Sequence, residues 1–298
     1  MRTIPTRALL LPTVCLALSV FVGGKARPQQ LCSVIPAPKT RTAAYMFSIQ
    51  QERILGDIEA EWVENNYQAF HAEDRAAHLN AIVARVVSQF PHDLALVQVI
   101  LIDTPEAGSF GVGPERIYIT RKMVALLRND DELAGLLGHE LAHILTHHNA
   151  IIVGELFHEI LHVNAVSGRK DISEKLMRLV DSINRDPKLM WKAAQIIDRQ
   201  EGGPQNDADR VALYAMAAAG FSPQAYVDLF DRAAGMNGNG GNILTDVFAD
   251  ATSERRRFRE IKKNLSHLPP PCRDIPPADS TEFRTWQAAV ISDPHSAW

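Results

Sequence analysis

The chain has 298 residues, enough for one large domain or two small ones with a sizeable buried core. Its composition is 46% hydrophobic and 22% charged, which excludes the collagen-like, coiled-coil and wholly disordered classes. The formal net charge of −4 argues against a diffuse nucleic-acid binder, because such proteins normally carry an excess of basic residues.

The first 26 residues are typical of a secretory signal peptide. Arg2 and Arg7 precede an apolar run over 8–22, and small residues follow as far as Ala26. The run of about 15 residues is short for a membrane span, which needs about 20. We therefore expect an exported protein, periplasmic or extracellular, with no membrane span after signal cleavage. The alternative is that the segment is retained as an N-terminal anchor.

Two of the three cysteines remain after signal cleavage, because Cys15 lies inside the signal. An even number of cysteines in an exported chain favours a disulfide, here between Cys32 and Cys272. Such a bond would fasten both ends of the chain to its body. The alternative is a pair of buried free thiols.

The rest of the chain divides into three zones. The segment 27–41 contains Pro and Gln and is expected to be irregular, whereas 42–265 carries strong periodic patterns that we expect to form one domain. The Pro-rich segment 266–298 predicts an extended tail along the surface. Helical spacing is found over 43–65, 74–90, 172–184, 187–200, 204–219, 222–235 and 245–265.

Two strands are predicted in the first half of the body. Residues 94–102 are almost continuously apolar and rich in Val and Ile, which favours a buried strand. Residues 116–120 read as a second, short strand, and a loop containing Gly and Pro joins the two. This arrangement predicts a small sheet with an exposed edge in a mostly helical protein.

The next predicted helix contains an HExxH motif. Asn129 is a good N-cap, and Glu132 three residues later completes a pattern like a capping box. Four helical residues turn through about 400°, so His139 and His143 share one face, a turn apart. Two such imidazoles can bind one Zn²⁺, and Glu140 between them can act as the general base toward water. A surface helix with two solvated histidines would leave Glu140 unexplained, because it falls inside an apolar stripe.

A second HExxH follows at His158 and His162. No third-ligand candidate follows this motif in a recognisable context, and no edge strand precedes it. We interpret these histidines as part of a helix that covers the core, although local geometry alone would allow zinc there too.

With these motifs the chain resembles the HtpX and CAAX prenyl protease family of zinc metallopeptidases, which are gluzincins. The resemblance covers roughly 45–262, and its matching segments are 129–143 with His148, 109–110, 117–119, 208–210 and 219–223. It implies an α+β, mostly helical, zincin-like fold with a small mixed sheet beside the HExxH helix, and a single zinc ion. It also implies a polypeptide substrate that pairs in extended form with the strand containing Arg116, Ile117, Tyr118 and Ile119.

The third zinc ligand is where the chain departs from the family. The family has a Glu at the position of Gln205, and a neutral amide oxygen is a poorer zinc ligand than a carboxylate. Asp207 and Glu201 are nearby carboxylates that remain alternatives. Asp209 matches the family's carboxylate that orients a ligand histidine.

A second departure lies near the end of the domain. The family has a His-Pro pair and a later Arg, and their positions fall on Ser253 and Arg259 in this chain. The resemblance therefore implies that Arg259 stabilises the oxyanion. The alternative is that Arg259 belongs to a solvated basic helix face over 255–259.

Together these features predict a zinc-dependent endopeptidase that acts on exported or misfolded proteins. The competing interpretation is a degraded gluzincin that binds polypeptides in a chaperone-like way without cutting them, because Gln205 and Ser253 both depart from the family pattern. The sequence leaves the oligomeric state open.

Overall fold

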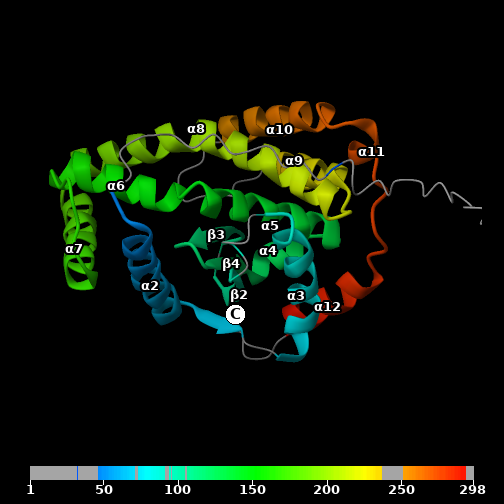
Figure 1. Ribbon diagram of the computed structural model, residues 1–298, viewed down its shortest axis with the longest axis horizontal. Helices are drawn as coiled ribbons and strands as arrows, with labels where there is room; N and C mark the ends of the chain where they lie inside the picture. The colour runs from blue at the N-terminus through cyan, green and yellow to red at the C-terminus, as the bar shows by residue number, and fades with distance from the viewer. Residues whose placement is uncertain are drawn as a thin grey trace, which may run out of the picture.

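The structure is a computed structural model that describes residues 32, 46–70, 73–90, 94, 96–104, 106–236 and 251–292. The segment expected to be a signal peptide, 1–26, lies outside the described residues, as does most of 27–41. The helices are α2 (Ile49–Asn66), α3 (Glu73–Val87), α4 (Arg121–Leu126), α5 (Asp130–Leu145), α6 (His148–Leu161), α7 (Arg169–Arg185), α8 (Pro187–Ala218), α9 (Pro223–Met236), α10 (Ala251–Ser266), α11 (Pro270–Arg273) and α12 (Thr281–Ile291). The strands are β1 (Gln68–Phe70), β2 (Gln98–Asp103), β3 (Ser109–Val112) and β4 (Arg116–Thr120). The chain is thus mostly helical with a small sheet, as predicted (Figure 1).

The sheet is mixed, and its strand order within the described residues is β1-β2-β4-β3. The apolar strands β2 and β4 run parallel in the middle, and β1 and β3 pair with them in antiparallel fashion. One face of the sheet, with Ile117 and Ile119, belongs to the same core as α5. The other face, with Ile102 and Tyr118, packs in a separate core with residues of α2.

Strand β3 was predicted to be part of a loop, because its neighbourhood is rich in Gly and Pro. It forms a strand because Phe110 pairs with Tyr118 of β4 and stacks on its ring, with the two ring centroids 5.4 Å apart. Gly113 follows with a φ of 57°, a conformation that glycine adopts without strain.

The extra strand overturns one expectation about the site. Arg116, Ile117, Tyr118 and Ile119 do not form an exposed edge, because β4 pairs with β2 on one side and with β3 on the other. Their backbone groups are used inside the sheet. Within the described residues the free edge beside α5 is β3 instead.

Helix α5 lies at the centre of the molecule. The side chain of Asn129 caps it, as predicted, by accepting a hydrogen bond from a first-turn N–H at 2.9 Å. Two glycines allow other helices to come close: a Cβ on Gly135 would lie 2.5 Å from the ring of Tyr226, and one on Gly138 would lie 3.2 Å from Cα of Ala212. α5 therefore packs directly on both α8 and α9.

Helix α8 is one element where the sequence predicted two, over 187–200 and 204–219. Pro204 lies inside it. Proline lacks an N–H and normally breaks a helix, but α8 continues through Pro204 and packs along both α5 and α6. Gln205 and Asp209, one turn apart, consequently face α5 together.

The segment 266–298 is only partly the extended tail that its prolines predicted. It contains α12, whose buried side chains Phe283, Trp286 and Val290 share one helix face. This face packs against α3 and α4. No helix in the described ranges combines the length and the apolarity needed to cross a bilayer.

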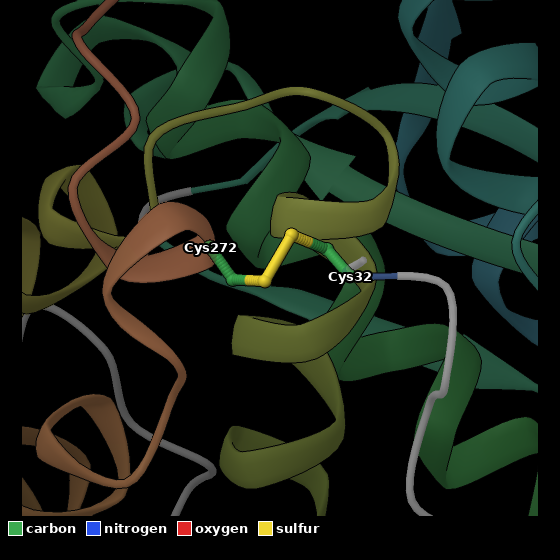
Figure 2. The surroundings of a disulfide bond; sticks show 2 residues. All are labelled: Cys32 and Cys272. Carbon is green, nitrogen blue, oxygen red and sulfur yellow. A yellow bond between two sulfur atoms is a disulfide. The ribbon is translucent and has the colours of Figure 1, made fainter. Parts of the chain in front are cut away.

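A disulfide joins Cys32 to Cys272 in α11, across 240 residues of sequence (Figure 2). Both cysteines are buried in the main core. The bond attaches Cys32 to α11, which packs against α8 and α9.

Candidate metal centre and active site

The rings of His139 and His143 meet on one side of α5. Their Nε2 atoms are 3.0 Å apart, and their ring centroids are 4.5 Å apart with nearly perpendicular planes. Two imidazoles on one tetrahedral zinc ion, each about 2.0–2.1 Å from it, hold their nitrogens about 3.3 Å apart. The two donor atoms are therefore placed to share a metal ion.

Helix α8 brings Gln205 to the same position. Its Oε1 lies 3.3 Å from Nε2 of His143. Of the two alternative donors, Asp207 accepts hydrogen bonds from Arg210, and the side chain of Glu201 lies outside the described residues. Gln205 is thus the third donor that the geometry supports.

The carboxylate of Glu140 is 6% exposed and borders the same space. The hydroxyl of Ser109, from β3, donates a hydrogen bond of 2.6 Å to Glu140 Oε1. The predicted general base is therefore linked directly to the edge strand.

Asp209 orients His139 from behind. Its carboxylate is fully buried, with Oδ1 2.9 Å from His139 Nδ1, and the hydroxyl of Tyr226 donates to it at 2.8 Å. Arg257 donates through Nε and Nη2, both at 2.8 Å. Burial alone would raise the pKa of Asp209, but Arg257 and His139 outweigh it and hold that pKa well below its usual range. Burial next to this carboxylate raises the pKa of Tyr226, so its hydroxyl stays a donor.

The cation at the site is Arg257 and not Arg259, which corrects the expectation from the resemblance. The guanidinium of Arg257 lies 4.6 Å from the ring centroid of Phe230, and its Nη2 is 3.2 Å from His139 Nε2. Arg259 is exposed.

Helical spacing alone predicts that Arg257, and not Arg259, faces the core. Arg257 precedes the buried Ile261 by four residues and so shares its face, whereas Arg259 precedes it by two and points about 200° away. The side chain of Ser253 lies outside the described residues.

His148, noted in the resemblance, supports the ligand His143. The two rings stack with centroids 4.5 Å apart, and their Nδ1 atoms are 2.8 Å apart. Burial, together with His139, His148 and Arg257, lowers the pKa of His143 well below its ordinary value. A neutral imidazole keeps a lone pair for a metal.

These groups line a cleft of about 310 Å³ between β3, α5, α8 and α10. The N–H of Thr120 donates to the Gly108 carbonyl at 3.0 Å. Because hydrogen bonding alternates along an antiparallel pair, the backbone groups of Ser109 and Gly111 face away from β4. An extended chain can therefore pair with β3 directly beside Glu140.

The other end of the cleft carries a second polar pair. His147 Nδ1 lies 2.8 Å from Glu52 Oε2 of α2, and this hydrogen bond raises the pKa of His147. His147 has a φ of 54°, and this left-handed residue separates α5 from α6.

The second HExxH has none of this geometry. α6 ends at Leu161, and His162 is exposed with a φ of 56°, so it does not continue the helix that carries His158. His158 bonds to Asn164 at 2.7 Å, and Glu159 pairs with Lys192 at 3.1 Å. The interpretation of these histidines as part of a covering helix agrees with this arrangement.

Among the described residues, no group of three His, Cys, Asp or Glu side chains is arranged to hold a metal ion, and the third donor at the first motif is an amide.

The sequence profile described as Peptidase family M48 matches residues 73–285. Comparison with curated proteins gives no match.

Proposed function

The chain belongs to peptidase family M48 and is therefore a metallopeptidase. We propose that it is a zinc-dependent endopeptidase. The observation that carries the proposal is the meeting of His139, His143 and Gln205 beside the buried carboxylate of Glu140.

The residues present fit a zinc ion. Two imidazole nitrogens and an amide oxygen approach one another within 3.0 and 3.3 Å. Asp209 hydrogen-bonds to the far nitrogen of His139, as carboxylates do behind zinc-bound histidines. The donor set carries no negative charge, so we expect weaker metal binding than with a Glu at position 205.

When bound, zinc acts as a Lewis acid that polarises the scissile carbonyl and lowers the pKa of water. Glu140 takes the proton of the attacking water and passes it to the leaving amine. Ser109 donates a hydrogen bond to Oε1 of that carboxylate, and Glu140 borders the cleft.

Arg257 supplies the fixed positive charge. Its salt bridge to the buried Asp209 holds the guanidinium at the wall of the cleft. From there it stabilises the negative charge that develops on the carbonyl oxygen, the role that the resemblance assigned to Arg259.

The substrate is a polypeptide in extended form that pairs with β3. Backbone hydrogen bonds to Ser109 and Gly111 are largely independent of side-chain sequence, which suits a peptidase acting on exported or misfolded proteins. The N-terminal signal pattern and the disulfide between Cys32 and Cys272 support an oxidising compartment outside the cytoplasm.

A test combines metal analysis with proteolysis. The purified chain is expected to hold one zinc per molecule and to cleave casein, and Glu140→Gln is expected to keep the zinc and lose cleavage. Glu159→Gln, at the equivalent place in the second motif, is the matched control and should behave as the parent. Full cleavage by Glu140→Gln would overturn the mechanism.

Gln205 also favours a second candidate function, a polypeptide-binding protein that does not cut. That function predicts that dialysis against a weak chelator removes the metal, and that unfolded casein binds equally well with and without zinc. Stoichiometric zinc retained through dialysis, together with cleavage, would exclude it.

A further inference from the structure

The corner formed by α7 and the start of α8 exposes an unusual share of apolar side chains. Of the large hydrophobic residues that are exposed in the described ranges, half lie here: Met177, Val180, Met190 and Trp191, with exposed fractions of 54–67%. Figure 1 shows α7 and the beginning of α8 at one end of the molecule, on the opposite side from α12. We call residues 169–192 the elbow.

The exposed residues are not the core face of α7. That face is filled by Ile172 and Leu179, seven residues apart and buried. Met177 and Val180 lie three apart on a second, outward face, and Trp191 is 67% exposed in the first turns of α8. α7 and α8 contact each other, and exposed apolar residues concentrated on two neighbouring helices are typical of an interaction site.

The elbow is also basic in an acidic protein. Between Arg169 and Lys192 it carries seven basic and four acidic side chains, while the whole chain has a net charge of −4. Lys170 and Arg185 are 91% and 79% exposed, and each pairs with a carboxylate of α7, Glu174 and Asp181. Three more basic groups also pair with carboxylates: Arg169, Lys175 and Lys192. Exposed ion pairs of this kind are weak, so their basic partners can still bind phosphate. Arg178 and Lys188 are exposed as well.

We propose that the elbow docks this protein onto an anionic membrane surface. Trp and Met side chains insert at the boundary between headgroups and acyl chains, and Lys and Arg bind the lipid phosphates around them. A second copy of the chain is a poorer partner, because it would bring another basic elbow against the first.

Docking would fix the distance between the bilayer and the cleft. α8 runs without a break from Trp191 to Gln205, a rise of about 21 Å along the helix. The cleft would then lie within reach of polypeptide segments that emerge from or lie on the membrane. The proposal does not depend on catalysis and stands whether or not the protein cuts its substrate.

Vesicle flotation of the full chain tests the proposal. It is expected to bind vesicles of phosphatidylcholine that contain phosphatidylglycerol at least about tenfold more tightly than phosphatidylcholine alone. Trp191→Asp with Met177→Ser should weaken that binding by about tenfold or more. Trp62→Asp, which changes an exposed Trp on α2, is the matched control and should bind as the parent. Any contribution of the apolar N-terminal segment is common to all variants.

A second pair of variants separates a bilayer from other anionic partners. Arg178→Glu with Lys188→Glu should abolish the preference for phosphatidylglycerol. If only these charge variants matter and the Trp191 and Met177 changes do not, the elbow binds polyanions in general and the proposal fails. It also fails if the elbow variants bind vesicles like the parent, or if Trp191→Asp instead dissolves a dimer seen by light scattering.

Discussion

The chain contains the same five-residue pattern twice, and only one copy is built into a site. His139 and His143 lie on α5 with their Nε2 atoms 3.0 Å apart, and Glu140, which lies between them in the sequence, is buried. His158 and His162 lie at the end of α6, where the helix stops before the second histidine. The helix continues through both histidines only in the first motif, and the proposed ligand pair depends on that continuity.

The two motifs also differ in their burial and in the elements that pack against them. α5 is covered by α8, which supplies Gln205 and Asp209, by α9, which supplies Tyr226, and by β3, which supplies Ser109. The second motif meets Asn164 and Lys192 instead, and its Glu159 is satisfied by an ordinary ion pair. Each experiment below tests one part of this contrast.

The largest effect is expected from the second histidine of each motif. His143→Ala should remove stoichiometric zinc and lower kcat/KM by on the order of a thousandfold, because it deletes a metal ligand. His162→Ala should leave both unchanged. Zinc analysis and peptide cleavage measure the two quantities, and equal losses in the two variants would show that the second motif also binds metal.

The next largest effect concerns the two arginines of α10. Arg257→Ala should lower kcat by about a hundredfold with little change in KM, because it removes a fixed cation at the site. Arg259→Ala, two residues away and exposed, should retain the parent kcat. The reverse order would return the oxyanion role to Arg259.

A smaller effect, a gain in zinc affinity, is expected from a substitution at Gln205, the proposed third donor. Gln205→Glu adds a carboxylate where an amide lies 3.3 Å from His143 Nε2, so zinc should bind about tenfold more tightly or better. Competition with a fluorescent chelator gives the affinity. An unchanged affinity would mean that position 205 does not contribute a ligand.

The smallest expected effect is a change in the free energy of unfolding at Glu59 of α2. Its carboxylate accepts a hydrogen bond of 2.7 Å from Asn149 of α6, the helix that carries the second motif. Burial raises the pKa of Glu59 to about 7 against the pull of that hydrogen bond, from an ordinary value of 4.5. Between pH 4.5 and about 7 the folded state therefore binds more protons at Glu59 than the unfolded state does. The stability of the fold consequently falls as pH rises through this range. Glu59→Gln should add about 1 kcal/mol at pH 8 and nothing at pH 4.5.

Thermal unfolding at the two pH values measures this difference. Glu61→Gln, on the same helix with a side chain 62% exposed, serves as the control. A stability gain for Glu59→Gln that is the same at both pH values would assign the effect to packing and not to charge.

The sequence was most informative where local and tertiary preferences agree. The Asn129 cap, the spacing of His139 and His143 and the apolar runs of β2 and β4 were predictable because helix capping, helical periodicity and β-propensity act over a few residues. They located the candidate ligand pair and the sheet beside it.

The errors occur where tertiary packing overrides local preference. Gly and Pro predicted a loop over β3 and a break in α8, yet the stacking of Phe110 on Tyr118 and the packing of α8 on α5 decided otherwise. The same cause hid α12, whose buried face follows a proline-rich stretch. The position of Arg257 was predictable from the sequence, because its spacing to the buried Ile261 distinguishes it from Arg259.

A nick in the backbone anywhere between Cys32 and Cys272 leaves two fragments that remain one covalent molecule. α5 and α8 both lie within this stretch, so a cut made by a neighbouring protease, or by another molecule of the same kind, does not let either helix diffuse away. A peptidase gains tolerance to a single self-inflicted cut in this way, and release of a piece would need a second cut within the stretch or reduction of the bridge.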